Sequence, residues 1–523
     1  MPPELEITSP TRGTFAEGDL IEVRGVVRDD AAAPTVTVNG VAAEVASDGQ
    51  FRVVVPVAAG VSILETVADD GAHQVKDVRA VLAGELRPVT EPVVDALGAQ
   101  VSPAAFAALS SVLTDTLSAL DLNALAKAHN PLYDNGGCLG AKVNIVKATT
   151  TGAHVALVPA ADGLATEVAI DGLDVIIGVK YKVACIGDST VIRVRADQVR
   201  VRGDLTLAVD DGVLAAGLDR ASVALPGFSI QTGGLPGVIV GLLDGKIKDA
   251  VEDALLDVVR DELPGLAADA LNELTGGVQT VDALGHELAL GLVPRTATID
   301  AAGLRLSLDA SAVVSGGEGA VYAATATPLA GAMDGGAGMA VAIADDALNQ
   351  VLAGLWSVGA IDLALPEDVA ATLALLIDDE VATVTLSPTL PPSARAADGA
   401  LAVTLGDLIL TARAADGEAL AELALSIETG LAVEPTAAGG LRLALGEPRV
   451  WAQVLVESAR VDRPLAADEF EDVVGAAWGL LGPALGEALD AITVPSIAGV
   501  SVIDAAVAGR DGYLVVEASL SAP

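Results

Sequence analysis

Apolar and polar residues alternate in short runs over the first 87 residues. Residues 21–24 and 51–55 alternate strictly, and residues 35–38 are mostly β-branched. The dipeptides Asn39-Gly40 and Asp48-Gly49 separate these runs, and both favour tight hairpin turns. Residues 1–87 are therefore predicted to form an all-β, immunoglobulin-like sandwich.

Beyond residue 88 the apolar spacing changes to that of amphipathic helices. Ser102 and Pro103 supply an N-cap and a first-turn proline for one helix. Three more helices are predicted at 236–263, from an N-cap at Asp345 onward, and at 466–489, each with apolar residues three and four apart. The four predicted aliphatic stripes are Phe106, Leu109, Leu113 and Leu117; Ile239, Leu243, Ile247, Val251 and Leu255; Leu348, Leu352 and Leu355; and Phe470, Val474, Trp478 and Leu481.

Long alternating segments lie between these helices. Between residues 139 and 228 they are broken at Thr151-Gly152, Asp162-Gly163 and Asp211-Gly212, which is typical of long antiparallel strands. The order strand, helix, sheet, helix occurs twice, and we interpret it as two related domains, 88–290 and 291–523. The predicted fold is α+β: two tandem barrel-like domains follow the sandwich, each a long curved antiparallel sheet wrapped on long helices.

An aliphatic helix stripe laid on a curved sheet has two alternative roles. It closes on the sheet as a solid core, or it stands off and leaves a slot for a hydrophobic ligand; periodicity alone favours the core. Aromatic residues make up only 2% of the chain, so either interior would be lined by Val, Leu, Ile and Ala. Such a lining offers few stacking surfaces for sugars or bases.

The net charge is −42, and the isoelectric point is about 4.1. Nucleic-acid binding needs a basic footprint, so this function class is excluded. Against this background, three strands are each expected to carry two basic residues on one face. If the strands adjoin, a basic stripe forms that would dock a membrane by its phosphate headgroups; the alternative is a solvated outer face paired with carboxylates. The six residues are Lys180, Lys182, Arg193, Arg195, Arg200 and Arg202.

Few residues point to catalysis or metal binding. The chain has two cysteines and four histidines, without a C-x-x-C, an H-E-x-x-H or a G-x-S-x-G motif. Adjacent acids such as Asp345-Asp346 are expected by chance among 71 acidic residues. We therefore expect no enzyme activity, no cofactor and no metal. Cys138 and Cys185 form either one disulfide or two buried thiols, and we predict the disulfide.

Two parts of the chain resemble known families. The segments "PTVTVNGVAAEV" and "DGQFRVVVPVAAG" resemble bacterial immunoglobulin-like modules of the glucodextranase-B type. Over about residues 90–523, "KIKDAVEDALLDVVRDELPGL" and "MAVAIADDALNQVLAGLWSVGAIDLAL" resemble the bactericidal/permeability-increasing family of tubular lipid-binding (TULIP) proteins. The second resemblance implies two barrels, each wrapping a curved sheet round a long helix and enclosing an acyl-chain slot. The helix stripes would line these slots.

The resemblance implies a function without catalysis. The protein would bind lipids or other hydrophobic ligands in two apolar slots, would be a candidate for moving them between membranes, and would contact membranes transiently. We expect an exported protein that is periplasmic, outer-membrane-associated or extracellular, although no export signal is visible. The alternative is a structural or adhesive cell-surface protein with closed cores and no ligand. No window approaches 18 uncharged apolar residues, so no membrane span is predicted.

Overall fold

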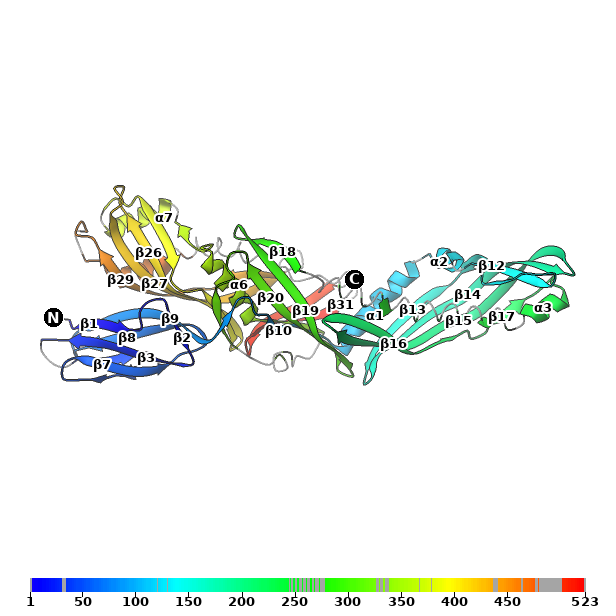
Figure 1. The fold of residues 1–523 in the computed structure, drawn as a ribbon, viewed down its shortest axis with the longest axis horizontal. Helices are drawn as coiled ribbons and strands as arrows, with labels where there is room; N and C mark the ends of the chain where they lie inside the picture. The colour runs from blue at the N-terminus through cyan, green and yellow to red at the C-terminus, as the bar shows by residue number, and fades with distance from the viewer. Residues whose placement is uncertain are drawn as a thin grey trace.

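The computed structural model has an elongated shape (Figure 1). It describes residues 2–30, 34–243, 278–325, 338–435, 441–461, 464–475 and 501–521, except 120, 129, 366 and 378. Isolated residues between 245 and 333 and Trp478 are also described. The sandwich and one curled sheet lie side by side at one end, a seven-stranded sheet crosses the middle, and another curled sheet forms the far end.

Residues 4–88 form the two sheets of the predicted sandwich. The sheet orders are β1-β3-β7-β6 and β2-β9-β8-β4-β5, with an aliphatic core between them. Asn39 and Gly40 both have positive φ, as the predicted hairpin turn between β4 and β5 requires. The strands are β1 Glu4–Ser9, β2 Thr14–Glu17, β3 Leu20–Arg28, β4 Thr35–Val38, β5 Val41–Ala42, β6 Glu44–Val45, β7 Gln50–Pro56, β8 Gly60–Asp69 and β9 Gln74–Pro88.

The central sheet combines strands from both halves of the remaining chain. Its order is β18-β19-β20-β10-β22-β31-β30. The strands that precede the first and third predicted helices, β10 and β22, are antiparallel neighbours, with Leu97 opposite Ile343. The strands are β10 Val93–Val101, β18 Val278–Ala283, β19 His286–Asp300, β20 Gly303–Val314, β22 Met339–Ala344, β30 Ser501–Arg510 and β31 Tyr513–Ser521. A further strand, β21 (Val321–Ala324), pairs with the end of β9.

The first curled sheet has the order β11-β12-β14-β15-β16, with β13 added to β14 and β17 to β15. Its two longest strands, β14 and β15, have 21 and 25 residues. The three predicted turns separate β12, β13 and β14, and β15 from β16, as expected. The elements are α1 Pro103–Ala119, α2 Leu122–Ala128, β11 Tyr133–Asn135, β12 Gly140–Thr149, β13 Gly152–Ala160, β14 Gly163–Val183, β15 Ile186–Asp210, β16 Val213–Ala224, β17 Ser229–Gln231 and α3 Gly237–Leu243.

The second curled sheet has the order β23-β24-β26-β27-β28, with β25 added to β26 and β29 to β27. Residues 467–475 are helical, within the predicted helix 466–489. The other elements are α6 Asp345–Ser357, β23 Leu363–Ala364, α7 Glu367–Ile377, β24 Thr383–Pro388, β25 Ser393–Ala397, β26 Ala400–Arg413, β27 Ala419–Pro435, β28 Leu441–Leu445 and β29 Arg449–Glu457.

The architecture is thus mostly β with curled sheets, whereas the long helices of the predicted α+β class are not clearly seen. The predicted helix 236–263 is described as α3, and most of its residues beyond 243 lie outside the described part. The domain limits at 87/88 and 290/291 stay predictions; the second falls inside β19. Within the described residues no single helix is long and apolar enough to span a membrane, while α1 and α2 pass that test only as a pair bent by 65°.

Candidate ligand-binding sites

The inner face of the first curled sheet is aliphatic. Buried side chains alternate with exposed ones along β12, β14 and β15, so the buried residues share one face. Ile239 of α3 is fully buried against that face. The sheet contributes Ala141, Val143, Ala148, Val175, Ile177, Val179, Ile192 and Val194 to this cluster.

Two hydroxyl groups hold α1 against the sheet. The backbone N–H of Leu157 donates to Ser110 Oγ at 2.9 Å, and that of Val155 donates to Thr114 Oγ1 at 2.9 Å. Both amides belong to β13, which pairs only with β14 among the described strands. The hydroxyls therefore replace the hydrogen-bond partners that an edge strand lacks. They fix α1 along β13 without requiring its leucines to fill a solid core.

The predicted stripe of α1 is only partly buried. Phe106 is buried, Leu109 and Leu117 are half-buried, and Leu113 is 42% exposed. Asp115 is the sole ionisable residue of this 17-residue helix. An aliphatic helix with partly exposed leucines therefore runs beside an aliphatic sheet.

The second and third predicted stripes end up in different places. In the second, Ile239 belongs to the first curled sheet, whereas the side chain of Leu243 and residues Ile247, Val251 and Leu255 lie outside the described part. In the third, Leu355 packs on β19 and β20 of the central sheet, and Leu348 and Leu352 pack beside β25 and β26. Helix α6 therefore fills a junction between two sheets.

The inner face of the second curled sheet carries a densely buried core. Phe470 and Trp478 of the fourth stripe are buried in it and Val474 is half-buried, while Leu481 lies outside the described residues. The Trp478 indole N–H donates to the carbonyl of Gly446 at 3.0 Å. Helix α7, which the sequence analysis missed, adds Leu373 and Ile377 to the same cluster. The acidic first turn Glu367-Asp368 was the available signal for α7.

The predicted basic residues occupy two strands, not three. Lys180 and Lys182 lie on β14, and all four arginines lie on β15, which runs unbroken from Ile186 to Asp210. Asp174 accepts from Arg193 Nε at 2.6 Å and from Arg195 Nε at 3.2 Å, and the Arg193 hydrogen bond is the main cause that lowers the pKa of Asp174. Glu167 pairs in the same way with Arg200 and Arg202. Ion pairs thus neutralise much of the arginine charge.

A disulfide closes the far end of the first curled sheet. Cys138, which precedes β12, is bonded to Cys185 in the turn between β14 and β15. The backbone N–H of Cys185 also donates to the carbonyl of Cys138 at 2.9 Å. Next to the disulfide, Leu139 is exposed and Ile186 is 77% exposed. On the adjoining strands, Lys180 stands opposite Lys142, whose ammonium group is paired with Asp134 at 2.7 Å, so this tip combines apolar side chains with the lysines of β14.

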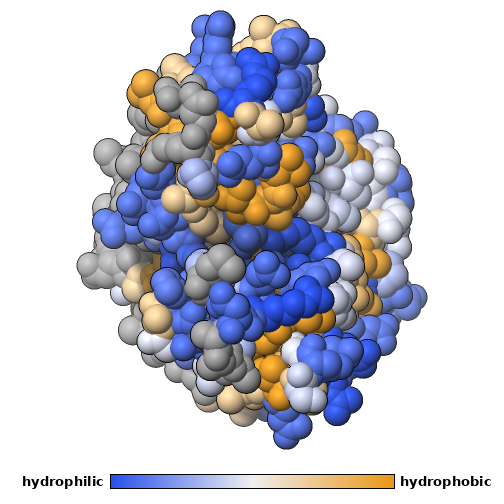
Figure 2. All heavy atoms as spheres, turned by 90° about the vertical axis from the view of Figure 1, so that its left-hand side faces the viewer, coloured by the Kyte–Doolittle hydropathy of each residue, from blue (hydrophilic) through white to orange (hydrophobic). Residues whose placement is uncertain are grey.

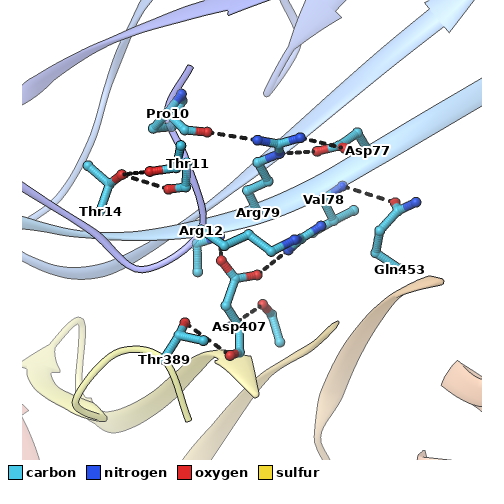
Figure 3. Close-up of polar contacts among 12 residues, drawn as sticks. Pro10, Thr11, Arg12, Thr14, Asp77, Val78, Arg79, Thr389, Asp407 and Gln453 are labelled. Atoms are coloured by element: carbon cyan, nitrogen blue, oxygen red, sulfur yellow. Dashed lines mark hydrogen bonds and ion pairs between the residues drawn. The ribbon is translucent and has the colours of Figure 1, made fainter. Parts of the chain in front are cut away.

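The sandwich is bound to the second curled sheet through a buried carboxylate (Figure 3). Asp407, whose side chain is 1% exposed, forms an ion pair with Arg12 and accepts from the Ala80 N–H at 3.0 Å. Burial raises the pKa of Asp407, and the Arg12 guanidinium opposes that rise. Beside this contact and within the sandwich, Arg79 Nη1 donates to the carbonyl of Pro10 at 2.9 Å. The sandwich is therefore a fixed part of this end of the molecule.

The N-terminus of α6 holds a second buried polar cluster. The predicted N-cap role of Asp345 is wrong, because Ala344 is the N-cap and Asp345 turns inward as the first helical residue. Its carboxylate accepts from Thr325 Oγ1 at 2.6 Å and from the Ala396 N–H at 2.9 Å. Burial raises the pKa of Asp345 to about 6. One turn later, Asn349 accepts the N–H of Ala394 at 2.6 Å and donates to its carbonyl at 3.0 Å.

Comparison with known proteins agrees with the sequence resemblance of the N-terminal module. The profile of the family described as glucodextranase, domain B, matches residues 3–83, which confirms the predicted type of the N-terminal module. No curated protein matches the sequence. Among solved structures, lipopolysaccharide-binding protein is 11% identical, with a TM-score of 0.45, over 82% of this chain and 100% of that one.

Two further solved structures are similar to parts of this chain. P47 of Clostridium botulinum E1 is 7% identical, with a TM-score of 0.23, over 82% of this chain and 100% of that one. Latherin is 19% identical, with a TM-score of 0.19, over 35% of this chain and 86% of that one. At these TM-scores the structural likenesses carry no functional conclusion. The function is therefore inferred from the residues of the candidate sites.

Proposed function

We propose that the protein binds a hydrophobic ligand, such as a lipid acyl chain, between α1 and the first curled sheet, without catalysis. The observation that supports this proposal is the partial exposure of Leu109, Leu113 and Leu117 beside an aliphatic sheet face. Covering apolar surface with a ligand's hydrocarbon gains about 25 cal/mol for each Å² removed from water. The hydroxyl contacts of Ser110 and Thr114 hold the helix against β13 without using its leucines.

Exchange with a membrane follows from the same energetics. An acyl chain with about 14 buried methylenes gains roughly 11 kcal/mol on leaving water, and a bilayer interior offers nearly the same gain. Moving the chain between protein and membrane is therefore close to neutral in free energy. We include transfer of the ligand between membranes in the proposal for this reason.

Membrane contact is assigned to the disulfide-closed tip. There Leu139 and Ile186 expose apolar side chains, and Lys180 and Lys182 have no ion pair within the described part of the chain. Apolar side chains insert at a lipid interface, and lysines beside them attract anionic headgroups. Because the arginines of β15 share Asp174 and Glu167, the lysines carry most of the attraction.

The disulfide supports the expected export of the protein. Disulfides persist in oxidising compartments and are rare in the cytosol. We therefore retain an extracytoplasmic location, in the bacterial envelope or outside the cell, as part of the proposal. Alkylation of free thiols in protein from its native cells tests this: an unmodified Cys138–Cys185 pair supports export, and two alkylated thiols contradict it.

One observation favours the structural alternative for the second curled sheet. The helices that cover its inner face bury their apolar side chains there, among them Leu373, Ile377 and Phe470, whereas Leu113 of α1 stays 42% exposed. We therefore place the proposed ligand only in the first curled sheet. This differs from the sequence-based expectation of one slot in each of the two barrels. A closed second half would serve as a scaffold.

Native mass spectrometry of gently purified protein tests whether a ligand is bound. The unsubstituted protein is compared with the variant Leu113→Asp. Bound lipid in the unsubstituted protein and its loss in Leu113→Asp are expected, because a carboxylate does not tolerate hydrocarbon contact. Leu375→Asp is the matched control, because Leu375 of α7 is 84% exposed on the other curled sheet. Protein that stays empty after incubation with lipid vesicles, or equal lipid loss in both variants, contradicts the proposal.

A further inference from the structure

A polar cleft separates the sandwich from the second curled sheet. Its volume is about 510 Å³, within the range of small-molecule sites. On the sandwich side its lining includes Asn39, Ile63 and Glu65, together with alanine and valine side chains. Arg395, Thr404, Glu428 and Arg449 line it from four strands of the sheet. The end of the molecule that bears these elements has a largely hydrophilic surface with separate apolar patches (Figure 2).

The strand register brings the polar side chains of the sheet onto one face. Thr404 of β26 stands opposite Glu428 of β27, and Glu428 stands opposite Arg449 of β29. Arg395 of β25 is two residues from Ser393, which stands opposite Thr404. Residues directly opposite in a sheet, or two apart on a strand, project from the same side. The two guanidinium groups therefore flank Thr404 and Glu428 on a rigid surface.

The cleft arginines differ from most arginines of this acidic protein. Arg193, Arg295 and Arg460 each contact carboxylates. Within the described part of the chain, neither Arg395 nor Arg449 forms an ion pair.

Arg449 instead lies over the ring of Trp451, with its guanidinium carbon 4.4 Å from the ring centroid. Trp451 is 8% exposed, and its indole N–H donates to Glu65 at 3.3 Å. The covered ring offers no free face for stacking, so a ligand meets the guanidinium groups first.

We propose that this cleft binds a small hydroxylated anion of the sugar-acid or polyol-phosphate class. Arg395 and Arg449 would take the anionic group, since guanidinium groups bind carboxylates and phosphates through paired N–H donors. Glu428 and Thr404 would accept hydrogen bonds from the ligand's hydroxyls. The polar lining does not suit an acyl chain, so this site is independent of the proposed hydrophobic site.

Isothermal titration calorimetry of the full chain tests the proposal. The probes are glucose 6-phosphate, glucuronate, glucose and inorganic phosphate. The two sugar anions are expected to bind at least tenfold more tightly than glucose, because hydrogen bonds to a charged group are stronger than those between neutral groups. The proposal is overturned if glucose binds equally well, or if no sugar anion binds at millimolar concentration. Inorganic phosphate that binds as tightly as glucose 6-phosphate overturns the assigned role of the hydroxyls.

Single substitutions locate the binding. Arg395→Gln and Arg449→Gln are each expected to weaken binding of the sugar anions by about 10- to 100-fold. Arg305→Gln on β20 changes the net charge equally and lies outside the cleft lining, so it should leave binding unchanged. A thermal melt identifies any misfolded variant, and equal affinity in all three overturns the site.

A competition experiment separates two sources of the same chemistry. Phosphatidylglycerol vesicles present a hydroxylated phosphate at a lipid surface, whereas glycerol phosphate presents it in solution. Displacement of glucose 6-phosphate by the vesicles assigns the cleft to a lipid headgroup. Displacement by glycerol phosphate alone assigns it to a soluble ligand, and displacement by neither overturns the polyol-phosphate class.

Discussion

Arg12 of the sandwich forms an ion pair with Asp407 of the second curled sheet, 395 residues away in the sequence. The carboxylate is buried, and the Arg12 guanidinium forms its ion pair, with Arg79 adding a weaker electrostatic attraction. Asp407 also accepts the N–H of Ala80, so one side chain binds two separate segments of the sandwich. This contact makes the N-terminal module a wall of the cleft.

Removing this carboxylate should destabilise the junction. In Asp407→Ala the Arg12 charge and the Ala80 N–H lose their buried partner, and breaking a buried pair costs about 3–5 kcal/mol. Chemical denaturation should show a lower free energy of unfolding or a separate transition for the sandwich. Glu22→Ala, which removes a partner of exposed Arg24, is the control, expected to change stability by less than about 1 kcal/mol. Similar curves for both variants would contradict this role.

The α6 junction should be more stable in acid than at neutral pH. The pKa of Asp345 rises from 3.8 when the chain is unfolded to about 6 in the folded protein, so the folded state holds the proton more tightly. Its stabilising contribution is complete below pH 3.8 and is lost as the pH rises through 6. About two pH units correspond to roughly 3 kcal/mol. Asp345→Asn should flatten the pH dependence of the free energy of unfolding between pH 4 and 6. An unchanged pH dependence would refute the raised pKa of Asp345.

Reduction of the disulfide should loosen the far tip of the first curled sheet. Cys138 and Cys185 are 47 residues apart, and closing a loop of that length stabilises a fold by about 4 kcal/mol in the chain-entropy treatment. A reductant is expected to lower the melting temperature of the unsubstituted protein and to leave Cys138→Ser/Cys185→Ser unaffected. If the melting temperature does not respond to reductant, the disulfide has no part in stability.

Substituting the tip lysines should weaken binding to anionic vesicles. Each lysine near such a surface contributes about 1 kcal/mol, so Lys180→Gln/Lys182→Gln should lose roughly 30-fold in partitioning at low salt. Arg200→Gln/Arg202→Gln is the control, because Glu167 already neutralises part of its charge. Vesicle sedimentation with and without anionic lipid measures the effect. A larger loss from the arginine pair would assign docking to β15 instead.

The asparagine clamp between α6 and β25 should be sensitive to truncation. Asn349 satisfies both backbone groups of Ala394, so Asn349→Ala leaves an N–H and a carbonyl buried without partners. Each unsatisfied group costs about 1–3 kcal/mol, which gives an expected loss of about 2–6 kcal/mol in the free energy of unfolding. The same truncation outside the clamp, Asn144→Ala on β12, provides the comparison, and its free energy of unfolding is measured in parallel. A loss below about 1 kcal/mol would show that water replaces the side chain.

The sequence predicted local structure well where it follows directly from periodicity. The turns at Thr151-Gly152 and Asp211-Gly212 and the start of α1 at Pro103 lie where alternation and capping placed them. The continuity of β15 was missed because its exposed face changes parity between Arg195 and Arg200. At that point the Asp197 N–H leaves the ladder and donates to the carbonyl of Pro226 at 2.9 Å. In the sequence, this change in the alternation of β15 therefore indicates the end of one strand and the start of another.

The candidate sites were less predictable because they depend on contacts between distant segments. The stripe of α1 follows from its spacing, but the exposure of Leu113 depends on how α1 lies against β13. Asp407 stands out in the sequence as one acid in an apolar run, yet nothing local identifies Arg12 as its partner. Likewise, Arg395 and Arg449 share one face only because β25, β26, β27 and β29 pair in register, and the sandwich then closes the cleft over them.

The pairing of β10 with β22 joins the two halves of the chain in one sheet. Each half supplies a strand whose hydrogen-bonding groups are matched by the other half, from Leu97 with Ile343 to Val101 with Met339. In a fragment ending near residue 325, β10 would lack its partner β22, and its unpaired backbone groups would promote aggregation. Co-expressed fragments should therefore become soluble only together, as two pieces that complement one another.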